Sequence, residues 1–359
     1  MRRFSCQSCG NEIYFDNGFC VHCNHRLGFL ADFNDMSAVE PFGAGWGALG
    51  GPSGQVFFCD NADIVNCNWL LPQGQQGGFC TACRHNRVVP DASVAGNVGK
   101  WRSIELAKRH LFYSLLRWRL PMPDRTQDPA HGLAFDFLAE TRNANGTLNP
   151  VMTGHEDGVI TLNIDEGDDA TRERRRKDLG EPYRTLIGHM RHEVGHYYWD
   201  RLVADAGRQG EFRALFGDER ADYGAALQRH YANGPPPDWA QRHVSAYAAA
   251  HPWEDFAESW AHWTHMVDGL ETARGYGMSF LSIARDTAPN AANEHQVGFD
   301  PYAERNATRI VKTWVPLTIA INSVNRSMGQ PDLYPFVLAG AVTAKLQFIN
   351  AIIHAGRGG

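Results

Sequence analysis

The chain lacks the features by which membrane, secreted and nucleic-acid-binding proteins are usually recognised. Its 359 residues contain no uncharged apolar run approaching the roughly 18 residues of a membrane span. Met1, Arg2 and Arg3 are not followed by the apolar stretch that a secretory signal peptide needs. The net charge of −6 offers no basic footprint for nucleic acid. These absences favour a cytoplasmic protein.

Cysteine is absent after Cys83, and all eight cysteines lie in the first quarter of the chain. In a reducing cytoplasm, clustered cysteines bind metal more often than they form disulfides. Four thiolates around one Zn²⁺ leave no position for water, which is typical of structural sites. We therefore predict two structural four-cysteine zinc sites, formed by Cys6, Cys9, Cys20 and Cys23 and by Cys59, Cys67, Cys80 and Cys83. Unpaired thiols are the alternative, more so for the second set, whose first spacing is irregular.

The cysteines divide the chain into three predicted parts. Residues 1–30 are expected to form a zinc ribbon, residues 31–95 a second four-cysteine zinc-binding region, and residues 96–359 a third, larger domain. In the last part, apolar residues at steps of three and four predict helices, and apolar alternation predicts two strands. The expected helices cover 101–118, 182–202, 217–234, 253–267, 306–326 and 332–354, and the strands 133–138 and 158–164. The predicted fold class is therefore α+β, mostly helical with a small sheet.

The motif His192-Glu-Val-Gly-His196 places two histidines four residues apart in one predicted helix. Such side chains project from the same face one turn apart, so both can reach a Zn²⁺ ion at about 2.0–2.1 Å. Glu193, between them, can take a proton from water at the metal. A coincidental match on a surface helix is the alternative, so the remaining sequence has to supply a third ligand.

No histidine follows the motif until His230, so the third ligand must come from farther along the chain. Glu254 and Glu258 are four residues apart and share one face of a predicted helix. One of them can bind zinc while the other accepts the Nδ1–H of a ligand histidine, which fixes its tautomer. Asp255 is an alternative ligand. Three further acidic residues are candidates, although such residues more often begin a solvated helix: Asp218, Glu219 and Asp222.

The run from Gly188 to His196, together with the segment 253–258, resembles the gluzincin metallopeptidases, in which a glutamate ligand on a later helix follows HExxH. Tyr247, seven residues before Glu254, makes the region similar to the catalytic domain of anthrax lethal factor. That resemblance implies that Glu254 is the third ligand, that Tyr247 donates to the oxyanion, and that Glu258, with Asp255, supports the ligands. Packing of Tyr247 at a helix edge is the alternative.

The same segments resemble a bacterial group of zinc-binding metallopeptidases that also carry an N-terminal zinc ribbon, so the resemblance extends over essentially the full chain. Other histidines near the motif are interpreted as structural, although His189 could touch substrate: His189, His251, His262 and His265. The aromatic residues of the region are expected to pack two metal-bearing helices together: Tyr197, Tyr198, Trp199, Trp253, Phe256, Trp260 and Trp263.

These features predict a zinc-dependent metallopeptidase with one catalytic and two structural Zn²⁺ ions and no organic cofactor. His192, His196 and Glu254 hold the catalytic ion, and Glu193 is the general base. The substrate is expected to be a peptide or protein, and the zinc ribbons could recruit a protein partner. Neither a membrane nor nucleic acid is expected as a partner.

Two other functions are compatible with the motifs. A ribbon-guided protease acting on nucleic-acid-bound proteins is disfavoured, because the cations of residues 1–30 are only Arg2, Arg3 and Arg26, too few for phosphate binding. A non-catalytic interaction module with a vestigial zinc site is disfavoured because such a site has no need to keep HExxH and the later glutamate and tyrosine.

Overall fold

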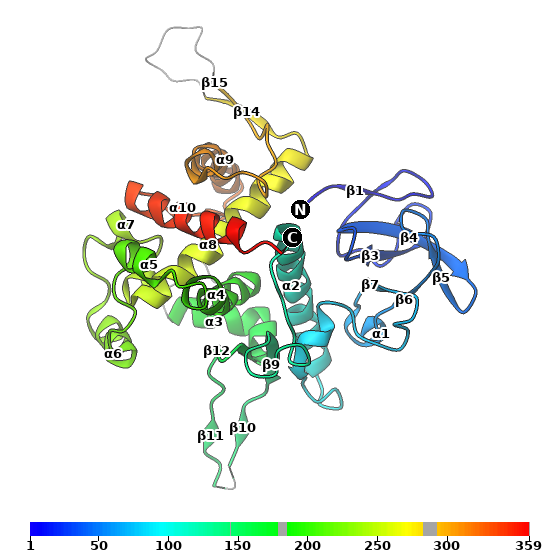
Figure 1. Cartoon of the computed structure of the whole chain (residues 1–359), viewed down its shortest axis with the longest axis horizontal. Coiled ribbons are helices and arrows are strands. Elements are labelled where there is room, and N and C mark those ends of the chain that lie inside the picture. Colours follow the sequence, from blue (N-terminus) through cyan, green and yellow to red (C-terminus); the bar gives the residue numbers. More distant parts are fainter. Residues whose placement is uncertain (144, 179–184, 283–292, 359) are drawn as a thin grey trace. The chain divides into compact units, whose positions relative to one another are not determined.

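The computed structural model describes residues 1–143, 145–178, 185–282 and 293–358 (Figure 1). The chain forms two compact units: one is residues 3–190, and the other is residues 1–2 with 191–359. Helices hold 44% of the residues and strands 15%. The predicted α+β class, with more helix than strand, is therefore confirmed.

The unit of residues 3–190 begins with a small hairpin, in which β1 (Phe4–Ser5) pairs antiparallel with β2 (Glu12–Ile13). A closed barrel of five strands follows, made of β3 (Arg26–Leu30), β4 (Asp35–Phe42), β5 (Gly45–Ala48), β6 (Gln55–Phe58) and β7 (Trp69–Pro72). Successive strands are antiparallel, and a parallel pairing of β3 with β7 closes the barrel.

The interior of the barrel is apolar and tightly filled. Its buried core consists of Leu30, Val39, Val56 and Leu70. Gly28 on β3 is required there, because a methyl group at this position would lie 2.5 Å from the Leu70 side chain. No barrel was predicted from residues 31–58, since four of the five strands have only four or five residues and two contain glycine.

Helix α2 (Asn97–Trp118) and a four-stranded sheet complete this unit (Figure 1). The sheet has the order β12-β13-β9-β8, with β9 parallel to both β8 and β13 and with β12 antiparallel at one edge. Its strands β9 and β13 confirm the two predicted strands, and α2 confirms the first predicted helix. The strand bounds are Asn86–Val88 (β8), Ala134–Leu138 (β9), Gly154–Glu156 (β12) and Val159–Asn163 (β13).

Shorter elements connect these parts of the unit. A second hairpin pairs β10 with β11. Two short 3₁₀ helices and two α-helices also belong here. Their bounds are Thr141–Arg142 (β10), Leu148–Asn149 (β11), Cys83–His85 (η1), Ile164–Gly167 (η2), Ala62–Val65 (α1) and Asp169–Asp178 (α3).

The second unit is mainly helical. The motif helix α4 (Leu186–Trp199), which enters this unit at Arg191, is followed by a π-helical turn, η3 (Asp200–Ala204). Helix α8 is the longest of the described helices and contacts α9 and α10. The remaining bounds are Gln209–Phe216 (α5), Tyr223–Asn233 (α6), Trp239–Arg242 (α7), Tyr247–Ala249 (η4), Pro252–Gly275 (α8), Ser279–Ser282 (β14), Asn293–Gln296 (β15), Ala307–Ser327 (α9) and Gly340–Ala355 (α10).

Glycine at position 195 allows α4 and α8 to pack closely. A methyl group there would lie 3.0 Å from the Cα of Ala257 and 3.2 Å from the Cβ of Trp260. Aromatic stacking continues the contact, with the rings of Tyr198 and Trp260 4.9 Å apart and 18° from parallel. The predicted role of the aromatic residues in joining the two helices is borne out by this pair.

Several predicted helix bounds were wrong. The helix expected over 332–354 begins only at Gly340, because the segment before it contains Pro335 and is tied to Asn322, whose amide oxygen accepts from the Tyr334 N–H (3.0 Å). The helix expected from 217 begins at Tyr223, where Asp222 caps it. Helix α8 runs eight residues beyond the predicted end at 267. Residues 182–184 of the predicted motif helix lie outside the described residues.

A fully buried ion pair within α2 is joined to β8 by a hydrogen bond from Asn86. Lys108 Nζ lies 2.9 Å from Glu105 Oε1, and both side chains have no exposed surface. Glu105 also accepts hydrogen bonds from Trp101 Nε1 (3.1 Å) and Asn86 Nδ2 (2.7 Å). Because these groups satisfy one another, removing a single partner leaves a charge without compensation in the interior.

We expect Lys108→Met to lower the free energy of unfolding by about 3–5 kcal/mol, because Glu105 loses its counter-charge while the apolar stem is kept. Lys100 is the matched control: its partner is Asp165, and both side chains are 32% exposed. Lys100→Met should cost less than about 1 kcal/mol. Urea denaturation of the metal-loaded protein measures both values, and equal losses would contradict this account.

Candidate metal centre

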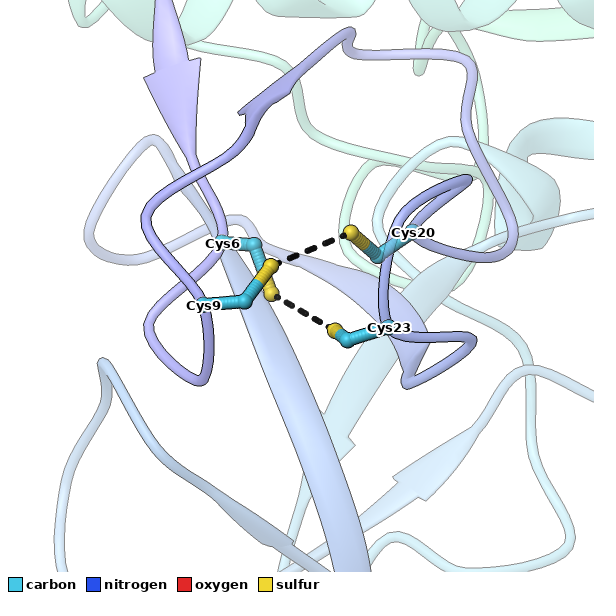
Figure 2. A group of neighbouring side chains, drawn as sticks. All are labelled: Cys6, Cys9, Cys20 and Cys23. Carbon is cyan, nitrogen blue, oxygen red and sulfur yellow. Dashed lines mark hydrogen bonds between the residues drawn. The ribbon is translucent and has the colours of Figure 1, made fainter.

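The first cysteine set gathers at two turns that face each other. Figure 2 shows Cys6 and Cys9 on one turn pointing toward Cys20 and Cys23 on the other. The Sγ atoms of Cys6 and Cys23 are 3.6 Å apart, as are those of Cys9 and Cys20. Tetrahedral zinc with Zn–S bonds of 2.3 Å requires S–S separations of roughly 3.8 Å. The four thiols therefore fit one zinc ion.

The second cysteine set is equally compact and more deeply buried. Cys67 Sγ lies 3.7 Å from Cys80 Sγ and 3.8 Å from Cys83 Sγ, and Cys59 completes the group. None of the eight cysteines, all of which lie among the described residues, forms a disulfide. The irregular spacing between Cys59 and Cys67 does not prevent the four sulfur atoms from meeting, because the α1 turn lies between them.

The third group that could hold a metal combines two residues of α4 with one from the first turn of α8. The Nε2 atoms of His192 and His196 are 3.2 Å apart. Glu254 Oε2 lies 3.0 Å from His192 Nε2, and Glu254 Oε1 lies 3.5 Å from His196 Nε2. Ligands of tetrahedral zinc at 2.0–2.1 Å stand roughly 3.3 Å from one another. The three side chains therefore fit a single zinc ion.

This group is buried, and His192 lies between the carboxylates of Glu254 and Glu258. His192, His196 and Glu254 are 8%, 5% and 1% exposed. Although burial acts to lower the pKa of His192, the carboxylates of Glu254 and Glu258 raise it well above its ordinary value. Carboxylates that favour a proton on the imidazole also favour a metal cation in its place.

Glu258 supports His192 from the side opposite the other ligands. Its Oε1 accepts from His192 Nδ1 at 2.7 Å, and its Oε2 accepts from Ser245 Oγ at 2.6 Å. Burial opposes ionisation, but His192 and Ser245 lower the pKa of Glu258 to about 2. The carboxylate thereby holds the proton on Nδ1. The Nε2 lone pair is then directed at the position that the three possible ligands surround, where a metal ion would lie. This is the arrangement predicted for one of the two glutamates.

Neither Ser245 nor Tyr223 was predicted from the sequence to belong to the site. Ser245 bonds Glu258 and also accepts from the N–H of Ala248, so it ties the carboxylate to the η4 turn. Tyr223, the first residue of α6, donates from its hydroxyl to Glu254 Oε1 at 2.7 Å. Neither residue carries a motif, and Tyr223 stands 31 residues before its partner, so no sequence signal could have found them.

Tyr247 and Glu193 lie close to the group of possible ligands. The Tyr247 ring stands 6.0 Å from the ring of His192. Burial, followed by the carboxylates of Glu254 and Glu193, raises the pKa of Tyr247, which keeps its hydroxyl protonated. Glu193 is 5% exposed on the turn between the two histidines. Their catalytic roles stay predictions.

The other acidic residues that were considered as metal ligands form ion pairs or cap a helix elsewhere in the unit. Asp255 is fully buried against Lys345 Nζ (2.5 Å) and His243 Nδ1 (3.1 Å), and it is not part of the possible ligand group. The three earlier candidates also have partners of their own: Asp218 pairs with Arg220, Glu219 pairs with Arg213, and Asp222 caps α6 through the N–H of Ala225.

The neighbouring histidines make contacts of a structural kind. His262 Nδ1 lies 2.7 Å from the Tyr334 hydroxyl, and burial lowers the pKa of His262 to about 4. His265 Nδ1 lies 2.6 Å from Arg191. In the unit of residues 3–190, His189 Nδ1 stands 3.7 Å from the buried Glu166. Trp253 packs its ring 4.5 Å from that of His196.

Comparison with known families assigns the chain to one of them. The family described as "Putative zinc-binding metallo-peptidase" matches residues 97–352, and a zinc-ribbon domain matches residues 3–94. The chain therefore belongs to this family of zinc-binding metallopeptidases and carries an N-terminal zinc ribbon. Both features agree with the resemblance drawn from the HExxH segment and the later glutamates.

Relatives of the chain occur in mycobacteria. A protein of Mycobacterium bovis and proteins of two strains of Mycobacterium tuberculosis, all described as uncharacterized, are each 40% identical to this chain over 354 residues. The match covers 98% of this chain and 95% of each relative. No solved structure matches the chain. The likeness to anthrax lethal factor stays a prediction.

We expect a metal-saturated preparation to contain about three zinc ions per chain, one for each of the three groups. The ion at the His–Glu group should exchange more readily, because three protein ligands leave one position open, whereas the four-cysteine sites are closed. His196→Ala should lose the exchangeable ion and keep the other two. Mass spectrometry of the intact protein counts them, and a wild-type content of one ion or none would refute the assignment.

Proposed function

We propose that the protein is a zinc-dependent peptidase that hydrolyses peptide bonds in peptide or protein substrates. The observation that supports this most directly is the convergence of His192, His196 and Glu254, whose ligand atoms lie within 4.8 Å of one another. Glu193 lies on the helical turn between the two histidines, where a general base for hydrolysis is needed. A zinc ion held there would polarise the scissile carbonyl and lower the pKa of nearby water toward about 7.

Glu193 acts as the general base and then as the general acid. Its carboxylate accepts a proton from the water that attacks the scissile carbonyl carbon. It then delivers the proton to the departing amine nitrogen, so the carboxylate is restored at the end of the cycle. Its burial strengthens both steps, because water competes less for the carboxylate oxygens.

Tyr247 stabilises the negative charge that develops on the carbonyl oxygen. A neutral hydroxyl is required for such a donor, and a tyrosine hydroxyl is neutral at pH 7 because its ordinary pKa is about 10. The hydroxyl donates most strongly to an oxyanion and only weakly to a ground-state carbonyl, so its contribution falls on the rate of the chemical step.

The two cysteine groups give the N-terminal part a structural role. We assign a zinc ribbon to residues 1–30, a second zinc-binding region to residues 31–95 and the peptidase domain to residues 96–359. Residues 3–94 contain eight Asp or Glu against four Arg or Lys, which disfavours nucleic acid and suits a protein partner or substrate. Cysteines that are grouped for metal binding and form no disulfide suit a reducing, cytoplasmic setting. Among the described helices, none is long and apolar enough to cross a membrane.

Glu193→Gln should abolish nearly all turnover while the fold and zinc content are kept, because the amide matches the carboxylate in shape but cannot accept the proton. A proteome-wide cleavage profile of wild type against this variant measures the loss and identifies the bonds that are cut. Glu211→Gln, on the exposed face of α5, is the control and should retain activity. Undiminished hydrolysis by the Glu193 variant, with metal content verified, would falsify the mechanism.

Tyr247→Phe should lower kcat roughly 100-fold or more, which is the usual effect of removing one oxyanion donor. KM and zinc content should stay near wild type, because the lost bond forms mainly in the transition state. Steady-state kinetics on a peptide identified by the cleavage profile provide the test. If kcat is unchanged, Tyr247 only packs against the site and another group must stabilise the oxyanion.

A further inference from the structure

The segment that enters α6 runs along the first turn of α8. Gly217 comes so close to Pro252 that a methyl group at the glycine would lie 3.2 Å from the proline ring. Farther along, His251 Nε2 bonds the carbonyl oxygen of Ala221 (3.1 Å). At the end of the segment, Tyr223 bonds Glu254. Three contacts in succession therefore fix residues 217–223 to the helix that carries the proposed third ligand.

His251 acts as the bridge between the two segments. Its Nδ1 accepts the backbone N–H of Trp253 and caps α8, so its Nε2 carries the proton that is donated to Ala221. The Tyr223 ring packs edge-on against the His251 ring, with centroids 5.2 Å apart and an angle of 85°. Tyr223 is therefore held from the side as well as through its hydroxyl, although 39% of its surface remains exposed.

The hydrogen bond from Tyr223 gives the two carboxylate oxygens of Glu254 different surroundings. Oε1 accepts from the phenol at 2.7 Å. Oε2 accepts no hydrogen bond within the described part of the chain, is buried, and stands 3.0 Å from His192 Nε2. A carboxylate ligand with one oxygen occupied by a donor is held in a single orientation and presents the other oxygen to a metal.

We propose that Tyr223 is a positioning residue that orients Glu254 as a one-oxygen zinc ligand, and that its function differs from that of Tyr247. This inference rests on the proposed function, because it takes Glu254 as the third ligand. It gives the site two tyrosines with separate effects: Tyr223 governs how tightly metal is held, and Tyr247 governs the rate of the chemical step.

The packing of α6 explains why the hydrogen bond between Tyr223 and Glu254 is needed. Glutamate has three rotatable side-chain torsions, so a ligand at the first turn of a helix is poorly fixed without a partner. Within α6 the only buried residue is Ala226, and the helix therefore packs little against the rest of the unit. The Tyr223 hydroxyl and the contacts of residues 217–221 thus couple the placement of α6 to that of the ligand.

The test compares the full-length wild type with Tyr223→Phe, Tyr247→Phe and Tyr231→Phe. Tyr231 is the matched control, because it lies on the same helix and is 65% exposed. Affinity for the exchangeable zinc ion is measured by competition with a chelator, and the visible spectrum of Co²⁺ at this site reports ligand geometry. Peptide hydrolysis is then measured at saturating zinc.

Tyr223→Phe should weaken binding of the exchangeable zinc roughly 10- to 100-fold and alter the Co²⁺ spectrum, as loss of a hydrogen bond to a ligand does. With zinc in excess, its kcat should return close to the wild-type value. Tyr247→Phe should show the opposite pattern, with normal affinity and a reduced kcat. Tyr231→Phe should match wild type in both measurements.

Unchanged zinc affinity and an unchanged Co²⁺ spectrum in Tyr223→Phe would overturn the inference. So would a kcat that stays low at saturating zinc, since Tyr223 would then act on the reacting atoms. If the wild type hydrolyses no peptide but Tyr223→Phe still weakens zinc binding, the positioning role stands and the proposed function is wrong. If the wild type holds no exchangeable metal, the ligand set and the role of Tyr223 are both wrong.

Discussion

The contact between α4 and α8 at Gly195 is the constraint on which the candidate site depends. Because Gly195 carries no Cβ, Ala257 lies so close to α4 that even a methyl group at position 195 would stand 3.0 Å from the Ala257 Cα and require the helices to shift. His192 and His196 flank the glycine along α4, and the two glutamates flank Ala257 along α8. One close helix contact therefore brings all four chelating or supporting side chains within reach of a single ion.

Around this contact, hydrogen bonds support three side chains of the site: His192, Glu254 and Glu258. Ser245 holds Glu258, which holds Nδ1 of His192, while Tyr223 holds Glu254. Each bond removes rotational freedom from a ligand before metal arrives, which lowers the entropy lost when metal binds. Burial raises the strength of these bonds but would make an unpaired carboxylate costly, so the arrangement is stable only as a complete network.

Helical periodicity explains what could be predicted from the sequence. The spacings of His192 with His196 and of Glu254 with Glu258 each define one helix face, so both pairs could be recognised without a structure. CxxC spacing likewise identified the cysteine groups. Tyr223, by contrast, reaches Glu254 through a turn whose path depends on Gly217 and His251, and the barrel depends on short strands paired at long range. No local pattern encodes either.

Anomalous diffraction from crystals of the full chain, recorded above and below the zinc absorption edge, tests the central claim most directly. We expect a zinc peak bonded to His192 Nε2, His196 Nε2 and Glu254 Oε2, with the Tyr223 hydroxyl on Glu254 Oε1 and Glu258 outside the coordination sphere. A peak coordinated by Glu258 in place of Glu254, or no peak between the two histidines in metal-saturated crystals, would contradict it.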